Sequence, residues 1–263
     1  MAMSPRKRAR LSRAIQYVLL VLILVIAGLA VDWETVGPQF FNVEIITAMF
    51  PEVLTTALKN TVIYTACGFV FGLALGLVLA LMRLSSVGPY RWMATGFIEF
   101  FRGVPALVVF IAFGYGLPLA FQREVPGGLI GTATVALGLV GGAYMAETIR
   151  AGIQAVPKGQ TEAARSLGMS QGRAMRSIVI PQAFRIILPP LTNELILLTK
   201  DSSLIYVLGY TSATLELTAF SREVLNQEQN MSSLVAVGFC YLLITIPLAI
   251  VVRQMESRAE KAR

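Results

Sequence analysis

A chain of 263 residues, 56% of them hydrophobic and 14% charged, is too apolar for an ordinary soluble domain, and a mean hydropathy of +0.69 indicates a polytopic membrane protein. The sequence contains no histidine, which excludes histidine-based metal sites and triads, and we expect neither a metal nor a cofactor. The formal charge of +7 does not imply a nucleic-acid partner, because basic residues also mark the cytoplasmic ends of membrane spans. Cys67 and Cys240 both lie in apolar stretches, which predicts buried thiols and no disulfide.

The N-terminal region joins a basic segment to an apolar one. Residues 1–13 hold five lysines and arginines, and residues 17–31 are apolar throughout. A basic start, a short apolar run and the small residues Gly28 and Ala30 would fit a cleaved signal peptide. The same pattern fits an uncleaved transmembrane helix over 14–31, which we favour because polytopic proteins of this kind rarely need cleavage. In that case residues 1–13 form a basic cytoplasmic N-terminus.

Five further apolar segments predict five more spans. The second span covers 53–82 and carries Gly68, Gly72 and Gly76 at four-residue intervals, a small-residue face that lets another helix approach closely. The remaining spans are expected at 94–117 with a break at Pro105, at 129–149, from about residue 178 with Pro181, Pro189 and Pro190, and at 233–252.

The basic residues predict the orientation of these spans. If the N-terminus is cytoplasmic and the spans alternate, the cytoplasmic segments hold sixteen of the 22 lysines and arginines. The opposite orientation reverses this excess. We therefore expect both termini, and the loop between the fourth and fifth spans, to lie in the cytoplasm.

Residues 159–181, in that loop, are predicted to form two short helices joined by a tight turn. Thr161 is expected to cap the first helix, with Glu162 in its first turn near the positive end of the dipole. Gly168 is suited to the left-handed position that ends a helix, and Ser170 can cap the next one. A compact turn with small side chains is suited to a groove on another protein.

Two other interpretations of this loop compete. A helix, a glycine turn and a helix with nearby arginines also resemble a DNA-binding helix-turn-helix. That interpretation is disfavoured because no soluble domain surrounds the loop. The loop could also be an ordinary cytoplasmic connection that the positive-inside rule makes basic.

The residues of the loop distinguish among these interpretations. The loop resembles the EAA loop of binding-protein-dependent ABC importer permeases in Glu162, Ala163 and Ala164, in Gly168, and in the stretch IVIP at 178–181. The one departure is conservative, with isoleucine at 180 where the family has leucine. In that family the loop forms the coupling helix that docks into the ATPase subunit. The resemblance therefore implies an ATPase-coupling role for these four named residues.

Ionisable side chains at membrane depth are site candidates, because each is costly unless it faces a cavity or a partner. They are Glu99, Arg102, Glu147, Arg185, Glu194, Lys200 and Asp201. Glu99 and Arg102 could instead pair on one helix face. Glu147 and Arg150 could do the same. Lys200 and Asp201 could simply mark the outer water interface.

Glu194 is the strongest of these candidates. It follows Pro189 and Pro190, which remove backbone donors and are expected to break the helix. Non-helical backbone at this depth is tolerated only against protein or a wet cavity. With Asn193 beside it, the Glu194 carboxylate is suited to the ammonium group of a zwitterion, and Arg102 could hold the carboxylate of the same molecule.

Three longer motifs resemble those of polar amino acid permeases. They are FRGVP at 101–105, with Val104 where threonine is usual, GAYMAETIR at 142–150 followed by GIQAVPKGQ at 152–160, and NE at 193–194 continuing to KDSSL at 200–204, with Ser202 where threonine is usual. The similarity covers about residues 50–255. The residues that we expect to bind substrate are Arg102, Glu147, Asn193, Glu194 and Lys200.

The resemblance implies an all-α polytopic membrane protein with the type I ABC importer permease fold. Its core would be five transmembrane helices within 50–255, with the coupling loop at 159–181, one additional N-terminal helix at 14–31 and a cytoplasmic tail at 256–263. It further implies a location in the bacterial cell membrane and transport by alternating access. The implied partners are a second, identical or homologous permease, cytoplasmic ATP-binding-cassette subunits and an extracytoplasmic solute-binding protein.

The sequence contains no phosphate-binding loop of the Gly-x4-Gly-Lys-Ser/Thr type, so ATP hydrolysis must belong to a partner and the chain itself is not expected to be an enzyme. Two alternatives belong to other classes. A secondary transporter would use ion gradients, but such proteins usually have internal repeats and we see none. A membrane-embedded enzyme or assembly factor would need a catalytic pair, and we identify no nucleophile beside a base.

Overall fold

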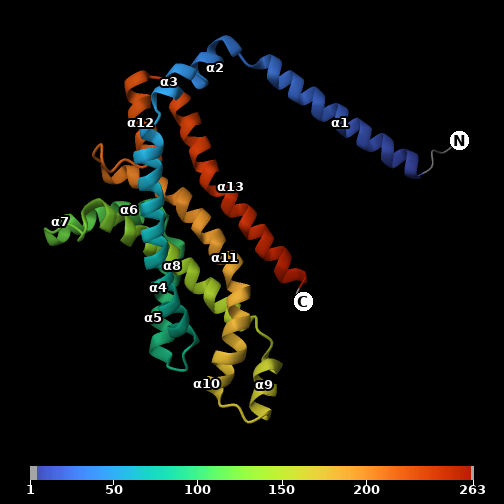
Figure 1. The fold of residues 1–263 in the computed structure, drawn as a ribbon, viewed down its shortest axis with the longest axis vertical. Coiled ribbons are helices and arrows are strands. Elements are labelled where there is room, and N and C mark those ends of the chain that lie inside the picture. Colours follow the sequence, from blue (N-terminus) through green and yellow to red (C-terminus); the bar gives the residue numbers. More distant parts are fainter. Residues whose placement is uncertain (1–4, 262–263) are drawn as a thin grey trace.

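The computed structural model describes residues 5–261, and this part of the chain is a set of helices joined by short turns (Figure 1). Within it, four helical segments are long and apolar enough to cross a membrane. They are Arg10–Ala30 in α1 (Pro5–Ala30), Val53–Leu84 in the π-helical turn η1 (Val53–Leu58) and α4 (Lys59–Leu84), Gly128–Gln154, which is α8, and Ser232–Arg258 in α13 (Ser232–Lys261). They lie where the sequence predicts its first, second, fourth and sixth spans. The protein is therefore a multi-pass membrane protein.

The third predicted span is a sharply bent pair of helices. Its first half is α5 (Gly88–Gly103), and its second half is a continuous helical segment that turns away from α5 by 105°. That second half consists of α6 (Ala106–Ile111), the π-helical turn η2 (Ala112–Gly116) and α7 (Leu117–Phe121). The break falls at Val104 and Pro105, as predicted, because proline lacks the N–H that would continue the α5 ladder. The bend leaves Arg102 in the last turn of α5.

α11 (Ile180–Asp201) differs from the prediction in two respects. The helix runs without a break through Pro189 and Pro190, which the sequence analysis expects to interrupt it. The missing donors are tolerated because α11 packs against α8 and α13. With 22 residues α11 is about 33 Å long, enough for a span, but its charged groups leave it less apolar than the four segments above.

The seam between α4 and α8 is the most closely packed part of the core. The predicted glycine face of α4 lies directly against α8, and the contacts advance in the same direction along both helices, which therefore run parallel. The paired positions are Gly68 with Leu137, Gly72 with Gly142, and Gly76 with Met145. A Cβ on Gly72 would lie 3.2 Å from the backbone nitrogen of Gly142, so only glycine fits without displacement. Both cysteines are free thiols as predicted; Cys240 is buried, whereas Cys67 is only half-buried.

At one end of the molecule the segments before α4 and after α11 pack together (Figure 1). They are α2 (Trp33–Phe40), α3 (Val43–Ala48), the 3₁₀ helix η4 (Ser202–Leu208) and α12 (Leu217–Glu228). The region from α2 to α3 is fastened to the turn between α12 and α13 by four hydrogen bonds of 2.8–3.0 Å. They run from Gln39 Nε2 to the Gln229 carbonyl, from Met231 N to the Gln39 carbonyl, from Asn42 N to Ser232 Oγ, and from Asn230 Nδ2 to the Pro38 carbonyl.

Glu216, with 1% of its surface exposed, holds α12 in place at this end. Its carboxylate accepts from the backbone N–H of Thr218 at 2.6 Å and of Ala219 at 2.7 Å, and so caps α12. The Tyr241 hydroxyl of α13 donates to the same carboxylate at 3.2 Å. Burial raises the pKa of Glu216 to about 7, while the hydrogen bonds oppose that rise.

α1 stands apart from the other helices (Figure 1). Its apolar side chains are exposed on all sides, and Trp33 Nε1 at the start of α2 donates to the Gly28 carbonyl at 2.7 Å. A helix that is apolar all round is typical of a segment surrounded by lipid.

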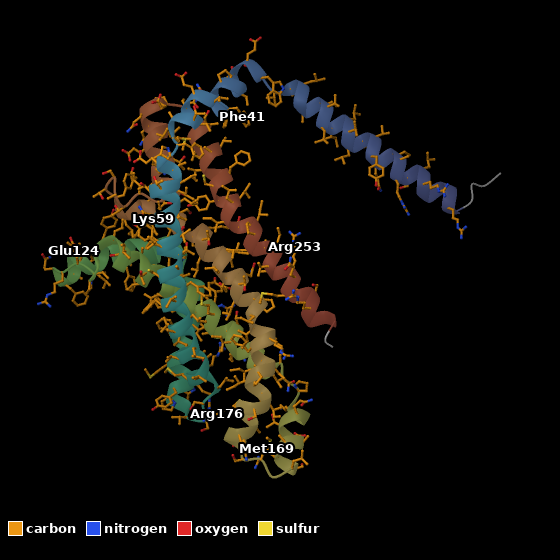
Figure 2. All side chains as sticks on the ribbon, viewed as in Figure 1. Phe41, Lys59, Glu124, Met169, Arg176 and Arg253 are labelled. Carbon is orange, nitrogen blue, oxygen red and sulfur yellow. The ribbon has the colours of Figure 1, made fainter. Side chains whose placement is uncertain are left out.

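The loop between α8 and α11 forms the opposite end of the molecule. α9 (Lys158–Ser166) and α10 (Gln171–Ala174) make a short helical hairpin, and the π-helical turn η3 (Met175–Val179) leads into α11. Figure 2 shows Met169 and Arg176 at this end, far from Phe41 at the end formed by α2 and α3. The predicted coupling loop is therefore a projecting element.

Candidate functional site

A cavity of about 430 Å³ lies where the corner between α5 and α6 meets α8 and α11. Its lining is mostly apolar, but four polar side chains from three helices contribute to it. They are Arg102 of α5, Tyr144 of α8, and Glu194 and Asp201 of α11. Two of the predicted substrate-binding residues, Arg102 and Glu194, are thus brought together although they are far apart in the sequence.

Arg102 is placed in this cavity by the break that ends α5. Its guanidinium carbon lies 5.5 Å from the centre of the Tyr144 ring, within the range of a cation–π interaction. Among the described residues Arg102 makes no salt bridge, so the pairing with Glu99 that the sequence allows is not formed. The five donors of the guanidinium therefore remain available to an anionic group in the cavity.

The acidic side of the cavity belongs to a single helix face. Glu194 and Asp201 are seven residues apart, which is two turns of α11, and both side chains are half-buried. The cavity thus has one cation on α5 and two carboxylates on α11. Separated charges of opposite sign in a half-enclosed space can hold the carboxylate and the ammonium group of a zwitterion.

Glu147 lies outside this lining and forms the ion pair with Arg150 that the sequence left open. Arg150 donates to Glu147 Oε2 through Nε at 3.1 Å and to Oε1 through Nη2. Arg83, at the end of α4, also donates to Glu147 Oε2, at 2.5 Å. The three side chains form a cluster next to the seam between α4 and α8, hereafter the Glu147 cluster.

Asn193 and Lys200 also lie outside the lining. Both side chains are exposed, and their spacing of seven residues places them together on a neighbouring stripe of α11. Their role in binding stays a prediction. Sequence reasoning overlooked Tyr144 and assigned no binding role to Asp201. The available signal was the distance of seven residues between Glu194 and Asp201, which places two carboxylates on one face of a helix.

The second candidate site is the turn between α9 and α10. Gly168 has a left-handed φ of +86°, as predicted. Its N–H donates to the Arg165 carbonyl at 2.9 Å, and the N–H of Met169 donates to the Ala164 carbonyl at 3.1 Å. This pair of bonds is a Schellman motif, which ends a helix tightly. The Ser170 hydroxyl caps α10 by accepting from Arg173 N, again as predicted.

The start of α9 corrects the prediction. The helix begins at Lys158 after Pro157, and Thr161 is an interior residue without a capping role. Proline is favoured at the start of a helix because its missing N–H would have no partner there. Glu162 accordingly lies in the second turn and is exposed.

The small-residue face of α9 is divided between two environments. Ala164 is buried beneath the hairpin, whereas Ala163 is exposed and Leu167 is 86% exposed at the tip. Leu167 is thus the apolar side chain that the hairpin presents at its tip.

Comparison with known proteins shows the family to which the chain belongs. The family described as binding-protein-dependent transport system inner membrane component matches residues 72–261. The chain belongs to this family of ABC import permeases. It is similar to the probable glutamine ABC transporter permease protein GlnM of Bacillus subtilis (strain 168), with 38% identity over 82% of this chain and 95% of that protein. It is also similar to the L-cystine transport system permease protein TcyB of the same organism, with 33% identity over 89% and 94%.

The fold of the permease agrees with this assignment. A crystal structure described as that of an amino acid ABC transporter with histidines superposes with a TM-score of 0.72 at 33% identity, covering 81% of this chain and 96% of that one. The permease therefore has the type I ABC importer fold and acts as the transmembrane subunit of such an importer. The family match leaves α1 outside its limits.

Proposed function

We propose that this permease imports polar amino acids. The observation that carries the proposal is the cavity in which Arg102 of α5 lies opposite Glu194 and Asp201 of α11. In this arrangement Arg102 binds the substrate carboxylate, and the two acids bind the ammonium group. The similar proteins support this substrate class, because the names of GlnM and TcyB assign them glutamine and cystine.

The transport cycle is driven from the opposite end of the chain. The hairpin of α9 and α10 docks into a cytoplasmic ATP-binding-cassette subunit through Glu162, Ala163, Ala164 and Gly168. The projecting position of the hairpin and its exposed Leu167 support this role. Closure of the ATPase subunits then moves the helices and opens the cavity alternately to either side. Hydrolysis belongs to the ATPase subunits, and the permease itself is not an enzyme.

The proposal includes an orientation in the membrane. Both termini and the hairpin lie in the cytoplasm, and the end formed by α2, α3 and α12 lies outside, where a solute-binding protein delivers the substrate. The excess of basic residues in the segments assigned to the cytoplasm supports this orientation. A second permease, identical or homologous, completes the pathway within the core of 50–255, and residues 14–31 add a helix to that core.

The test is ATP hydrolysis by the complete transporter in liposomes, with the permease, its co-purified ATPase and its binding protein. L-Glutamine, L-glutamate and L-arginine represent the three side-chain charges. Stimulation by at least one of them is expected. If a functional ATPase is bound and none of the amino acids stimulates it, the substrate class is wrong. If no ATPase co-purifies, the proposed coupling through α9 is wrong.

A further inference from the structure

α1 begins with three arginines on one face of the helix, hereafter the arginine row. Arg6, Arg10 and Arg13 are spaced by four and three residues, so each lies one turn from the next. All three side chains are exposed, and among the described residues none of them forms a salt bridge. Residues 1–31 contain no aspartate or glutamate, so this part of the chain supplies no counterion.

The arginine row is electrostatically unfavourable on its own. Like charges one turn apart on a helix repel each other. The start of a helix carries the positive end of its dipole and favours acidic residues, yet the first turn of α1 has none. An anion would stabilise this row, and it has to come from outside this segment of the chain.

The length of the apolar part of α1 places the arginine row at the level of lipid headgroups. Arg10–Ala30 has 21 residues and is about 31 Å long, which matches the hydrocarbon core of a bilayer, about 30 Å thick. At the far end Trp33, which donates to the Gly28 carbonyl, is a residue typical of the membrane–water interface. Arg13 then lies about 4.5 Å inside the hydrocarbon boundary. Its side chain points towards the helix N-terminus and so extends back to the headgroups, beside Arg10.

The surroundings of α1 favour lipid as the source of the anion. The helix stands apart from the others in Figure 1, and its apolar side chains are exposed on all sides. The guanidinium group matches the oxygens of a phosphate with two parallel hydrogen bonds. A zwitterionic headgroup carries a cation of its own, so a row of three positive charges favours a lipid with a net negative charge.

We propose that the arginine row binds the phosphate group of an anionic phospholipid in the cytoplasmic leaflet. Arg10 and Arg13 hold the phosphate at the headgroup level, and Arg6, about 6 Å further out, adds attraction from the water side. α1 is thus a lipid-binding helix attached to the permease core. The inference takes the leaflet from the proposed orientation, and it is independent of the substrate class and of the docking through α9.

Three variants separate a shaped site from the general attraction of basic residues to an anionic surface. Arg13→Gln removes one charge from the row. Ser12→Arg combined with Arg13→Ser keeps the composition and every charge, but moves one guanidinium group by about 100° around the helix. Arg253→Gln is the matched control, because this exposed arginine near the end of α13 has an acid, Glu256, three residues further along the same helix.

The measurement is native mass spectrometry of the solubilised permease–ATPase complex, titrated with phosphatidylglycerol or phosphatidylcholine to resolve the Kd of each successive lipid. Arg13→Gln and the relocated arginine should each weaken one phosphatidylglycerol site about fivefold, the effect of one basic residue at a membrane surface. Neither should change the Kd of phosphatidylcholine. Arg253→Gln should bind both lipids like the wild type. The same spectra show whether each variant keeps its permease and ATPase subunits.

The other outcomes would overturn the inference. If the relocated arginine binds phosphatidylglycerol like the wild type while Arg13→Gln binds it weakly, only general attraction acts and there is no shaped site. If both variants bind like the wild type, the row does not bind lipid. Loss of a subunit with unchanged lipid binding would assign the row to a protein partner, and displacement of the lipid by inorganic phosphate at constant ionic strength would assign it to a free anion. Amino-acid import is tested by the stimulation of ATP hydrolysis, which none of these outcomes decides.

Discussion

The backbone N–H of Met169 donates to the carbonyl of Ala164 at 3.1 Å, across a turn that Gly168 makes with a φ of +86°. A side chain at this position would strain the turn by about 1 kcal/mol and favour opening of the hairpin. Gly168→Ala is therefore expected to reduce the stimulation of ATP hydrolysis by the liganded binding protein several-fold. The melting temperature of the complex should change little, because the spans are untouched.

Gly159→Ala is the matched control for this change. Gly159 lies within α9 at an ordinary helical φ, and an added Cβ would meet nothing within 4 Å. Alanine is the better helix former, so α9 should be as stable or more so. Equal loss of stimulation in both variants would mean that any change to α9 disturbs docking, and that the left-handed turn has no special role.

Asp201 and Lys200 are adjacent in the sequence but lie on different stripes of α11, and only Asp201 lines the cavity. Asp201→Asn removes one of two carboxylates facing the ammonium group and should raise the Kd for amino acids about tenfold, the effect of losing a charged hydrogen-bond partner. Lys200→Gln should change Kd by less than a factor of about two, as for an exposed charge. Binding of amino acids to the solubilised complex measures both values of Kd. A larger increase for Lys200→Gln than for Asp201→Asn would support the sequence prediction that Lys200 binds substrate.

The seam between α4 and α8 should tolerate no added volume. Gly72→Val would place a Cβ 3.2 Å from backbone atoms of Gly138 and Gly142, which cannot move aside as a flexible side chain can. We expect a loss of about 1–3 kcal/mol in stability, seen as a lower melting temperature of the purified complex. At the exposed Gly238 in α13 an added Cβ would meet nothing within 4 Å, so Gly238→Val should melt like the wild type. Similar melting of both variants would show that the two helices can separate.

Glu216 should make the stability of the α12 end depend on pH. Its pKa is about 7 in the folded protein and 4.5 in the reference state, so the folded state binds the proton more tightly. The stability of the protein should therefore rise as the pH falls from about 7 towards 4.5. At pH 7.5 and above, this contribution, on the order of 2 kcal/mol, is lost.

Thermal unfolding of the wild type and Glu216→Gln at pH 7.5 and pH 5.5 measures this effect. The wild type should gain in melting temperature relative to the variant as the pH falls. Glu228→Gln, which changes an exposed carboxyl at the end of the same helix, should retain the pH dependence of the wild type. If Glu216→Gln and the wild type respond identically to pH, the carboxyl of Glu216 is not the responsible group.

Local features of the fold could be predicted because their causes are local. The glycine face of α4, the break at Pro105, the left-handed Gly168 and the Ser170 cap each depend on a few neighbouring residues. The break expected at Pro189 and Pro190 was wrong because packing on both flanks of α11 outweighs the loss of two donors. Tertiary contact, which no local pattern reveals, decided that case.

The same limit applies to the candidate site. The composition of the spans pointed to Arg102 and Glu194, since charges are rare at this depth. The prediction that Asn193 and Lys200 bind substrate does not distinguish the stripes of α11, and the structure places Asp201, not these two residues, in the cavity wall. The Arg83 partner of Glu147 lies 64 residues away, and only the parallel course of α4 and α8 brings the two side chains together.

α8 connects the two sites physically. It carries Tyr144 in the cavity wall, is held along its length by α4, and ends at Gln154, four residues before α9 begins. The distance from Tyr144 to the end of this helix is about 15 Å. A helix so closely packed can shift or tilt only as a unit with α4. A displacement of the hairpin would therefore be transmitted along α8 to the cavity wall. The helices that line the cavity would then change their relative angle at the break at Pro105.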